Sequence, residues 1–253
     1  NPSRPLELVK EEDIFKAIRK QDILLHHPYQ SFNPVIELIT QASRDPHVLA
    51  IKQTVYRTSA DSHLMKALIE AAQSGKEVTV VVELLARFDE EANLEWKTIM
   101  EEEGIKVLIG IPDKKVHAKI CLIEKRINNK LVKYGFISTG NLNEKTAKIY
   151  ADHCLMTSNK TILLEMNKVF NYIGNYQQGT KNIEGMKHLI VSPTNMREFF
   201  IHHINNEIKN AKSGIASKII VKLNSLTDEQ LIEHLYKAEK AGVEVQLIIR
   251  GIF

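Results

Sequence analysis

The chain has 253 residues, of which 43% are hydrophobic and 26% are charged, and its formal net charge is +3 at pH 7. This composition indicates a globular protein with enough apolar side chains for one large domain or two smaller ones. The net charge is too small to argue for nucleic-acid binding. The apolar runs also fall well short of the about 20 residues that a membrane-spanning helix requires.

The first residues, NPSRPLELVKEEDIF, lack the apolar stretch and the cleavage site of a secretory signal peptide. Cys121 and Cys154 lie in apolar, strand-like runs. We interpret them as buried reduced thiols, and the sequence leaves a disulfide between them open. Reduced thiols and the absence of a leader predict a cytoplasmic protein.

Helical and extended hydrophobic periods alternate along the first two thirds of the chain. Residues 1–20 are interpreted as a polar linker with a short helix. The elements predicted after it are a helix over 34–43 with Asn33 as N-cap, a strand over 48–57, a helix that Asp61 caps and Gly75 ends, a strand over 78–87, a helix over 89–104, strands over 106–111, 118–126 and 134–139, and a helix over 159–173. This order predicts an α/β fold with a mixed, largely parallel sheet flanked by helices.

The pattern then begins again. A short strand is predicted over 188–193, a helix over 194–212 and a strand over 215–223. Placing Gly242 on Gly75 superposes residues 228–249 on residues 61–82 without a gap, which indicates an internal duplication. We therefore predict a linker over 1–20, a first domain over 21–180 and the truncated start of a second, similar domain over 181–253.

Several familiar catalytic signatures are absent from the sequence, namely the P-loop, H-E-x-x-H and G-x-S-x-G. What stands out is PDKKVHAKICLIEK, which carries His117 and Lys119 two positions apart. If this stretch is a strand throughout, its period of two places both side chains on one face. A lone His-x-Lys is more often a solvated pair than a site, so other residues must support a functional interpretation.

Basic residues supply that support, because three arginines fall at the ends of predicted strands. Arg57 and Arg87 end strands of the first domain, and Arg250 ends the duplicated strand. Ligands of α/β sheets bind outside the carboxyl ends of the strands, where arginines suit phosphate oxygens. Imidazole is a competent nucleophile at neutral pH, so the site chemistry predicts phosphoryl transfer or phosphodiester chemistry through His117, with Lys119 offsetting charge.

The stretch STGNLNEKTAKIY adds a second group of candidates. Ser138 to Asn141 leave a predicted strand as a turn, and Lys145 and Lys148 follow. Backbone N–H groups of such a turn suit an anion. Asn141 and Lys145 are therefore candidate phosphate-binding residues.

Six stretches of the chain are long enough to be specific: DILLHHPYQSF, LAIKQTVYRTSADS, VTVVVELLARFDEEANLEW, KKVHAKICLI, STGNLNEKTAKIYADH and LIIRG. Together they strongly resemble bacterial polyphosphate kinases of the phospholipase-D-like type. The resemblance implies two phospholipase-D-like domains, the second one truncated here. It further implies an enzyme that reversibly moves the γ-phosphate of ATP onto inorganic polyphosphate with Mg²⁺, without nucleic acid, and as a homo-oligomer when full length. A cytoplasmic location fits this family, with peripheral attachment to the inner membrane left open.

The same resemblance implies roles for individual residues. The histidine of VHAK that becomes phosphorylated in the family is His117. Arg57 and Arg87 match the magnesium-linked phosphate site. Arginine has no lone pair for a cation, so we expect both to contact metal-bound phosphate. Tyr150 and Arg250 match positions that contact ATP.

The chain also departs from the wider phospholipase D pattern. Glu124 stands where His-x-Lys-x4-Asp has its acidic residue, and Thr139-Gly140-Asn141 replaces the usual Gly-Ser-x-Asn. The second catalytic histidine of the family lies outside this chain. Two alternatives to a kinase therefore stay open: a phosphodiesterase or nuclease that uses the same histidine, and a polyanion-binding fragment without turnover.

Overall fold

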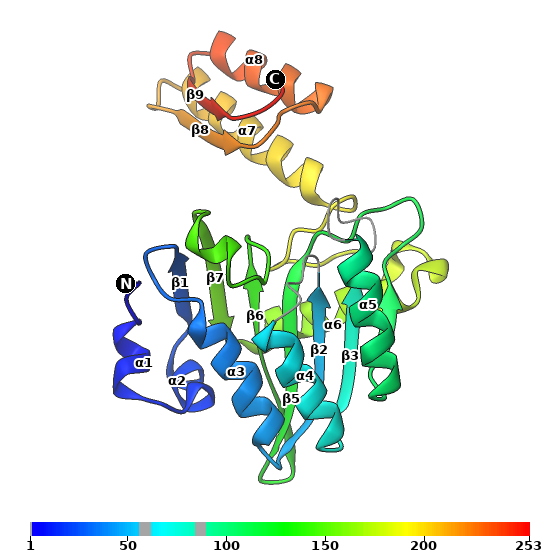
Figure 1. Cartoon of the computed structure of the whole chain (residues 1–253). Helices are drawn as coiled ribbons and strands as arrows, with labels where there is room; N and C mark the ends of the chain where they lie inside the picture. Colours follow the sequence, from blue (N-terminus) through cyan, green and yellow to red (C-terminus); the bar gives the residue numbers. More distant parts are fainter. Residues whose placement is uncertain (1, 56–61, 84–89) are drawn as a thin grey trace. The chain divides into compact units, whose positions relative to one another are not determined.

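The structure is a computed structural model that describes residues 2–55, 62–83 and 90–253, with residues 90–94 described by their backbone only. The chain divides into two compact units, Asn1–Asn182 and Ile183–Phe253. Unit 1 contains a seven-stranded sheet and unit 2 a two-stranded sheet (Figure 1). Arg57 and Arg87 lie outside the described residues.

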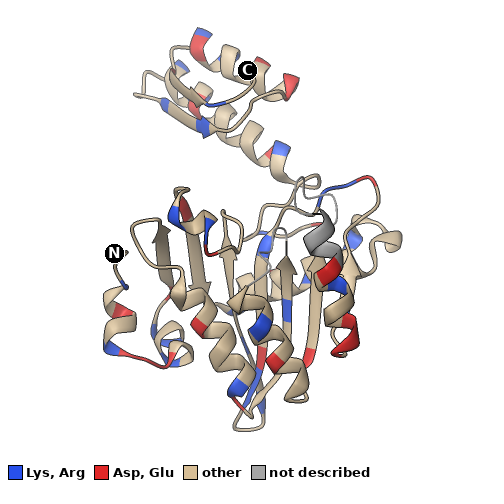
Figure 2. Cartoon of the chain, in the orientation of Figure 1, with Lys and Arg blue, Asp and Glu red and all other residues tan. Residues whose placement is uncertain are grey.

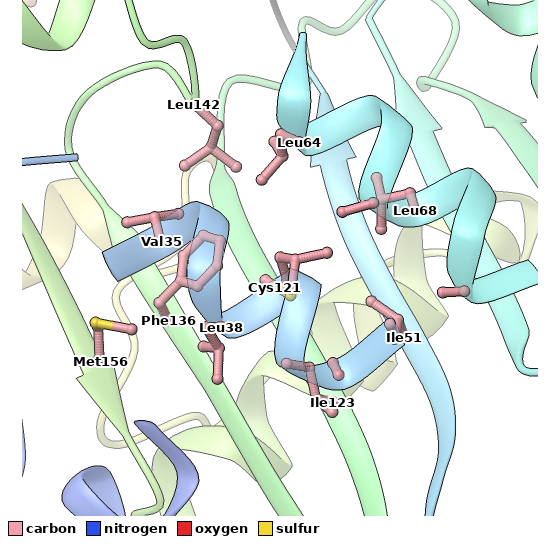
Figure 3. Packing of buried hydrophobic residues seen from close by; sticks show 14 of the residues in the cluster. Val35, Leu38, Ile51, Leu64, Leu68, Cys121, Ile123, Phe136, Leu142 and Met156 are labelled. Atoms are coloured by element: carbon pink, nitrogen blue, oxygen red, sulfur yellow. The ribbon is translucent and has the colours of Figure 1, made fainter. Parts of the chain in front are cut away.

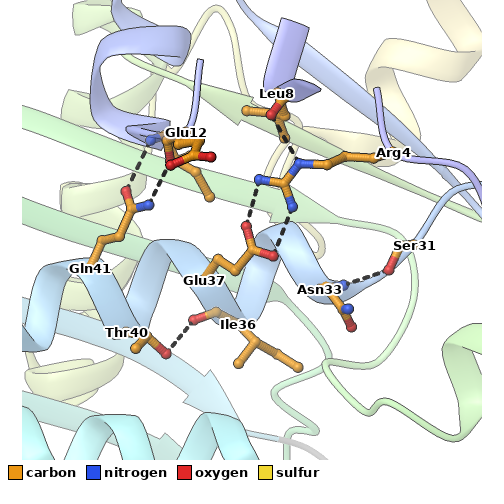
Figure 4. Close-up of polar contacts among 10 residues, drawn as sticks. Arg4, Leu8, Glu12, Ser31, Asn33, Ile36, Glu37, Thr40 and Gln41 are labelled. Carbon is orange, nitrogen blue, oxygen red and sulfur yellow. Dashed lines mark hydrogen bonds and ion pairs between the residues drawn. The ribbon is translucent and has the colours of Figure 1, made fainter. Parts of the chain in front are cut away.

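Residues 6–20 are part of unit 1 and not a linker. They form helices α1 (Leu6–Lys10) and α2 (Ile14–Lys20), whose apolar side chains join the main hydrophobic core. Arg4 makes a two-pronged ion pair with Glu37 at 2.7 Å for both contacts. Gln41 accepts the Ile14 N–H and donates to a backbone carbonyl of the same segment (Figure 4). Burial and these polar contacts together explain why the segment is ordered.

The sheet of unit 1 has the order β1-β7-β6-β5-β2-β3-β4. Its strands are β1 (Ile23–His27), β2 (Val48–Val55), β3 (Glu77–Val82), β4 (Lys106–Ile109), β5 (Lys119–Ile127), β6 (Lys130–Ser138) and β7 (Asp152–Thr157). The prediction of an α/β fold with a mixed sheet flanked by helices is confirmed.

The sheet is nevertheless less parallel than expected. Only β2, β3 and β4 pair in parallel, while the other four neighbouring pairs are antiparallel. One reason is the hairpin between β5 and β6, where Asn128 and Asn129 both have positive φ, at 49° and 61°. Two such residues form the tight turn that matches the twist of an antiparallel pair. The predicted strands over 118–126 and 134–139 correspond to β5 and β6, whereas the sequence analysis predicts no strand at β1 or β7.

Helices cover both faces of this sheet (Figure 1). On one face lie α3 (Asn33–Arg44), α4 (His63–Gln73) and α5 (Glu90–Glu102), and on the other lies α6 (Lys160–Gly174). Alternation along β2 shows the two faces, because Ile51 joins the core under α3 and α4 while Lys52 hydrogen-bonds Asn167 of α6 at 3.0 Å. Figure 3 shows side chains of α3 and α4 meeting those of β2, β5, β6 and β7.

Local sequence explains where most helices begin and end. The Ser62 side chain accepts the Met65 N–H and so caps α4, one residue after the predicted Asp61. Helix α3 starts at Asn33 itself, since Ser31 Oγ accepts the Asn33 N–H at 3.1 Å and takes over the capping contact. Gly75, at φ 80°, ends α4 as predicted.

Unit 2 consists of α7 (Met196–Lys212), β8 (Lys218–Leu223), α8 (Glu229–Lys240) and β9 (Glu244–Ile249). Strands β8 and β9 pair in parallel, as β2 and β3 do. Gly242, at φ 93°, separates α8 from β9 as Gly75 separates α4 from β3, so the superposed segments form the same elements in both units. The strand predicted over 188–193 is wrong, because the Asn195 side chain accepts the Val191 N–H at 2.7 Å and closes a turn there.

Both cysteines are free and buried. Burial raises the pKa of the Cys121 thiol well above its ordinary value and that of Cys154 to about 12, so both stay protonated at neutral pH. Among the described helices there is none with the length and apolar composition to span a membrane. Positive and negative side chains are mixed over each unit (Figure 2).

Candidate functional site

The strand ends of unit 1 meet at one edge of the sheet. Val55 at the end of β2 pairs with Val82 at the end of β3, and Lys119 at the start of β5 pairs with Ser138 at the end of β6. Asp152 at the start of β7 pairs with the last residue of β1. Most of the predicted site residues of unit 1 follow or precede these ends, so their loops share this edge.

His117 lies in the segment that leads from β4 to β5 and is exposed. Strand β5 begins only at Lys119, which is buried with 4% of its surface exposed. The expectation that both side chains share one face of a strand is therefore wrong. The reason is that the segment directly before Lys119 does not pair with a strand, and the side chains of Glu83 and Lys119 hydrogen-bond its backbone instead.

The Lys119 ammonium donates to the main-chain carbonyl of His117 at 2.6 Å. Its neighbour Ile120 donates its N–H to Thr54 Oγ1 at 3.0 Å, and Thr54 is itself buried. A buried ammonium is stable only when hydrogen bonds replace its hydration. Lys119 therefore places a positive charge beside the backbone that presents the His117 imidazole.

The turn after β6 is tied to the start of β7. The Thr139 hydroxyl donates to Asp152 Oδ1 at 2.8 Å and accepts the His153 N–H at 3.0 Å. The N–H groups of Thr139 and Gly140 donate to the His153 carbonyl and the Ser138 hydroxyl. These two N–H groups are therefore used within the chain.

The following loop is fixed to the core and leaves its cations exposed. Leu142 and Ala147 are buried in the main core, and Asn143 Oδ1 accepts the N–H groups of the next turn. Glu144 contacts His63 Nδ1 at 3.1 Å and so ties the loop to α4. The predicted residue Lys145 is exposed on this loop.

The other predicted side chains of this loop lie on the same edge. Asn141 is half-buried, Lys148 is exposed, and Tyr150 is 52% exposed two residues before β7. The structure therefore brings the loops of His117, Asn141, Lys145 and Tyr150 to one end of unit 1.

Gly140 has a strict packing requirement. A Cβ at this position would lie 2.3 Å from Asp152 Oδ2 and 2.4 Å from its Cγ. Gly140→Ala is expected to displace Asp152, break its contact with Thr139 and lower the free energy of unfolding by about 1–3 kcal/mol. Denaturant unfolding measures the loss.

Asp152→Ala, combined with Gly140→Ala in a double-mutant cycle, is the control for this prediction. With Asp152 shortened, an alanine at 140 gains room, so the double variant should lose less stability than the sum of the single variants. Strict additivity would contradict the proposed clash between Gly140 and Asp152.

The remaining predicted residues are placed differently. Arg250 is exposed in unit 2 directly after β9, and its Nε donates to Asn224 Oδ1 at 2.9 Å. Arg57 and Arg87 fall outside the described residues. Glu124 forms an ion pair with Lys133, its partner on β6. It lies about 16 Å along β5 from Lys119, at 3.3 Å per residue, and is therefore distant from the other predicted residues of unit 1.

Sequence reasoning missed Thr54 and Glu83. Thr54 is buried on β2, and its Oγ1 accepts the N–H of Ile120, the second residue of β5. Glu83 directly follows β3, is 3% exposed, and accepts the Val116 N–H through Oε2 at 2.7 Å. The available signal was Glu83 itself, an acidic residue within the predicted strand over 78–87.

Two family models match this chain: polyphosphate kinase C-terminal domain 1 over residues 13–179, and polyphosphate kinase C-terminal domain 2 over residues 189–253. Their boundaries agree with the two units of the fold, so the class is that of the C-terminal domains of polyphosphate kinases. The chain belongs to the polyphosphate kinase family.

Curated relatives and solved structures agree with this assignment. The polyphosphate kinase of Vibrio cholerae is 48% identical over 94% of this chain, and that of Escherichia coli is 46% identical over 94%. The chain spans about a third of the length of these relatives, 33% and 34%. The crystal structure of the Porphyromonas gingivalis polyphosphate kinase matches 98% of this chain and 41% of its own, with a TM-score of 0.84 and 38% identity.

A more distant structure shares the fold alone. The phosphatidylserine synthase of Haemophilus influenzae covers 91% of this chain and 61% of its own, with a TM-score of 0.52 and 11% identity. That likeness supports the α/β architecture and says nothing about the reaction of this chain.

Proposed function

We propose that the protein reversibly transfers the γ-phosphate of ATP to inorganic polyphosphate through a phosphohistidine at His117. The observation that carries the proposal is an exposed imidazole on a backbone segment that the buried Lys119 holds by its carbonyl, in a chain of the polyphosphate kinase family. An accessible nucleophile on a rigid backbone is what a covalent phosphoryl carrier requires.

The reaction is two successive displacements at phosphorus. In the first, an imidazole nitrogen of His117 attacks the γ-phosphorus, the N–P bond forms, and the bond to the β–γ bridging oxygen breaks to release ADP. In the second, a terminal oxygen of polyphosphate attacks the same phosphorus, and the N–P bond breaks. The imidazole is regenerated, and the reverse sequence makes ATP from polyphosphate.

Positive charge near the transferring group lowers the barrier of both steps. Lys119 supplies a buried cation beside the His117 backbone, and Lys145 supplies an exposed cation on a loop of the same edge. We propose that Asn141 and Tyr150 contact the nucleotide from that loop. We also propose Arg250 as an ATP-contacting residue.

We propose that magnesium acts with the phosphates and not in a protein-built cage. The described residues contain no group of three His, Cys, Asp or Glu side chains that suits a metal ion, so their donor set does not fit such a cage. In the proposal Arg57 and Arg87 contact phosphate oxygens that carry the metal, because guanidinium has no lone pair.

The test is a product assay on the full-length protein with γ-labelled ATP and a polyphosphate primer. We expect label to pass through an acid-labile, base-stable protein adduct and then to appear in polyphosphate. Incubation of labelled polyphosphate with ADP should return the label to ATP. Hydrolysis of a phosphodiester substrate without any transfer to polyphosphate would contradict the proposal and favour the phosphodiesterase alternative.

A further inference from the structure

A buried carboxylate lies at the loop edge of unit 1. Glu83 directly follows β3, and 3% of its surface is exposed. Its backbone N–H donates to the Val55 carbonyl at 3.1 Å, which fixes where its side chain starts. Removing a carboxylate from water costs several kcal/mol unless hydrogen bonds compensate for the lost hydration. The contacts of this carboxylate therefore indicate what it is for.

The carboxylate reaches the segment that carries His117. Glu83 Oε2 accepts the Val116 N–H at 2.7 Å, and a Cβ added to Gly110 would lie 3.6 Å from the same oxygen. The carboxylate thus lies between the end of β4 and the residue directly before His117. Hydrogen bonds to ionised acceptors are shorter and about twice as strong as neutral ones.

Two charged, buried side chains therefore hold the backbone around His117 from both sides. Glu83 binds the N–H of the residue before it, and Lys119 binds the carbonyl of His117 itself. Both are at least 96% buried, as their exposed fractions are 3% and 4%. The imidazole is exposed at the centre of this fixed backbone.

We propose that Glu83 is a positioning residue for His117. It acts through the Val116 N–H and sets the place and direction of the imidazole before phosphate arrives. The proposal rests on the proposed phosphoryl transfer through His117. Misplacing a reacting group by 1 Å can cost about 10²-fold in rate, so shortening the Glu83 side chain by one methylene should slow the transfer.

Two conservative variants of the full-length protein separate the effect of side-chain length at position 83 from the effect of charge. Glu83→Gln keeps an acceptor oxygen at the same distance and loses the charge, whereas Glu83→Asp keeps the charge and retracts the oxygen by one methylene. We measure the single-turnover rate of acid-labile labelling at saturating γ-labelled ATP, the Kd of ATP, and thermal unfolding. Glu77→Gln and Glu77→Asp are the controls, since Glu77 is exposed at the other end of β3.

We expect Glu83→Gln to label at close to the wild-type rate and Glu83→Asp to label at least about tenfold more slowly, each with an ATP Kd near that of the wild type. Glu83→Asp labelling at the wild-type rate would overturn the proposal. So would the reverse ranking, which would mean that the charge acts directly. Absence of label in the wild type and both Glu77 controls would instead overturn the proposed function, so the two failures are distinguishable.

Discussion

His117→Ala in the full-length protein is expected to abolish the acid-labile phosphoryl adduct and the synthesis of polyphosphate from ATP. The imidazole supplies the nitrogen atom of the proposed N–P bond, and alanine has no nucleophilic side-chain atom to replace it. The side chain is exposed, and the main-chain carbonyl of His117 accepts a hydrogen bond from Lys119 that alanine keeps. Surface substitutions usually change stability by about 0.5 kcal/mol or less, so the unfolding transition should stay in place. Labelling and thermal unfolding of the same sample measure both expectations.

His234→Ala is the matched control for this experiment. His234 is a half-buried histidine on α8, and its Nδ1 contacts the Gln230 carbonyl at 2.7 Å. The control should keep full labelling. A His117→Ala protein that still acquired label would place the phosphorylated residue elsewhere and remove the central step of the proposed function.

Gly135→Ala is expected to have the largest effect on stability. Gly135 lies on β6 opposite Leu122 of β5 and also pairs with β7. An added Cβ would lie 2.1 Å from the Cys121 carbonyl oxygen and 3.0 Å from a methyl group of Leu163. A main-chain carbonyl inside a sheet has little freedom to move aside, so strands must shift.

Overpacking of this kind costs about 3 kcal/mol or more, which corresponds to a fall in Tm of roughly 6–12 °C for a domain of this size. Differential scanning calorimetry measures the change. Gly174→Ala is the control, because its Cβ would make an ordinary contact of 3.5 Å with Leu108 and its φ is not in the left-handed region. A Gly135→Ala transition at the wild-type temperature would contradict the packing described for β5 and β6.

Much of the secondary structure was predictable because it is encoded locally. Hydrophobic periods gave the helices, and Gly75 and Gly242 gave the points where α4 and α8 end. The duplication was visible for the same reason, since a repeated unit repeats its local signals. Boundaries that depend on one capping side chain, such as Ser62 in place of Asp61, shifted by a residue.

The pairing of strands was less predictable, because it depends on contacts distant in sequence. The edge strand β1 pairs with β7 over residues 23–27 and 152–156. Neither strand has a sequence pattern that identifies its partner. A short alternating run is compatible with either direction of pairing. This is why the sheet was expected to be largely parallel.

The candidate site shows the same division. His117 stood out by residue type and motif, but the burial of Lys119 and its contact with the His117 carbonyl follow from where β5 begins. The role of Glu83 follows from a hydrogen bond to a residue 33 positions away. Such contacts arise only when the chain is folded.

The duplication has residues of opposite charge at equivalent backbone positions of its two copies. When Gly242 is superposed on Gly75, Arg250 falls on Glu83, and each donates its N–H to the strand before, to Leu223 and to Val55. In unit 1 the side chain turns inward and binds its own chain, whereas in unit 2 it is exposed. The two copies have therefore diverged at this position. A chimera carrying either copy twice would have two buried carboxylates or two exposed guanidiniums there. Under the proposals above, it would lose either the residue that positions His117 or the residue that contacts ATP.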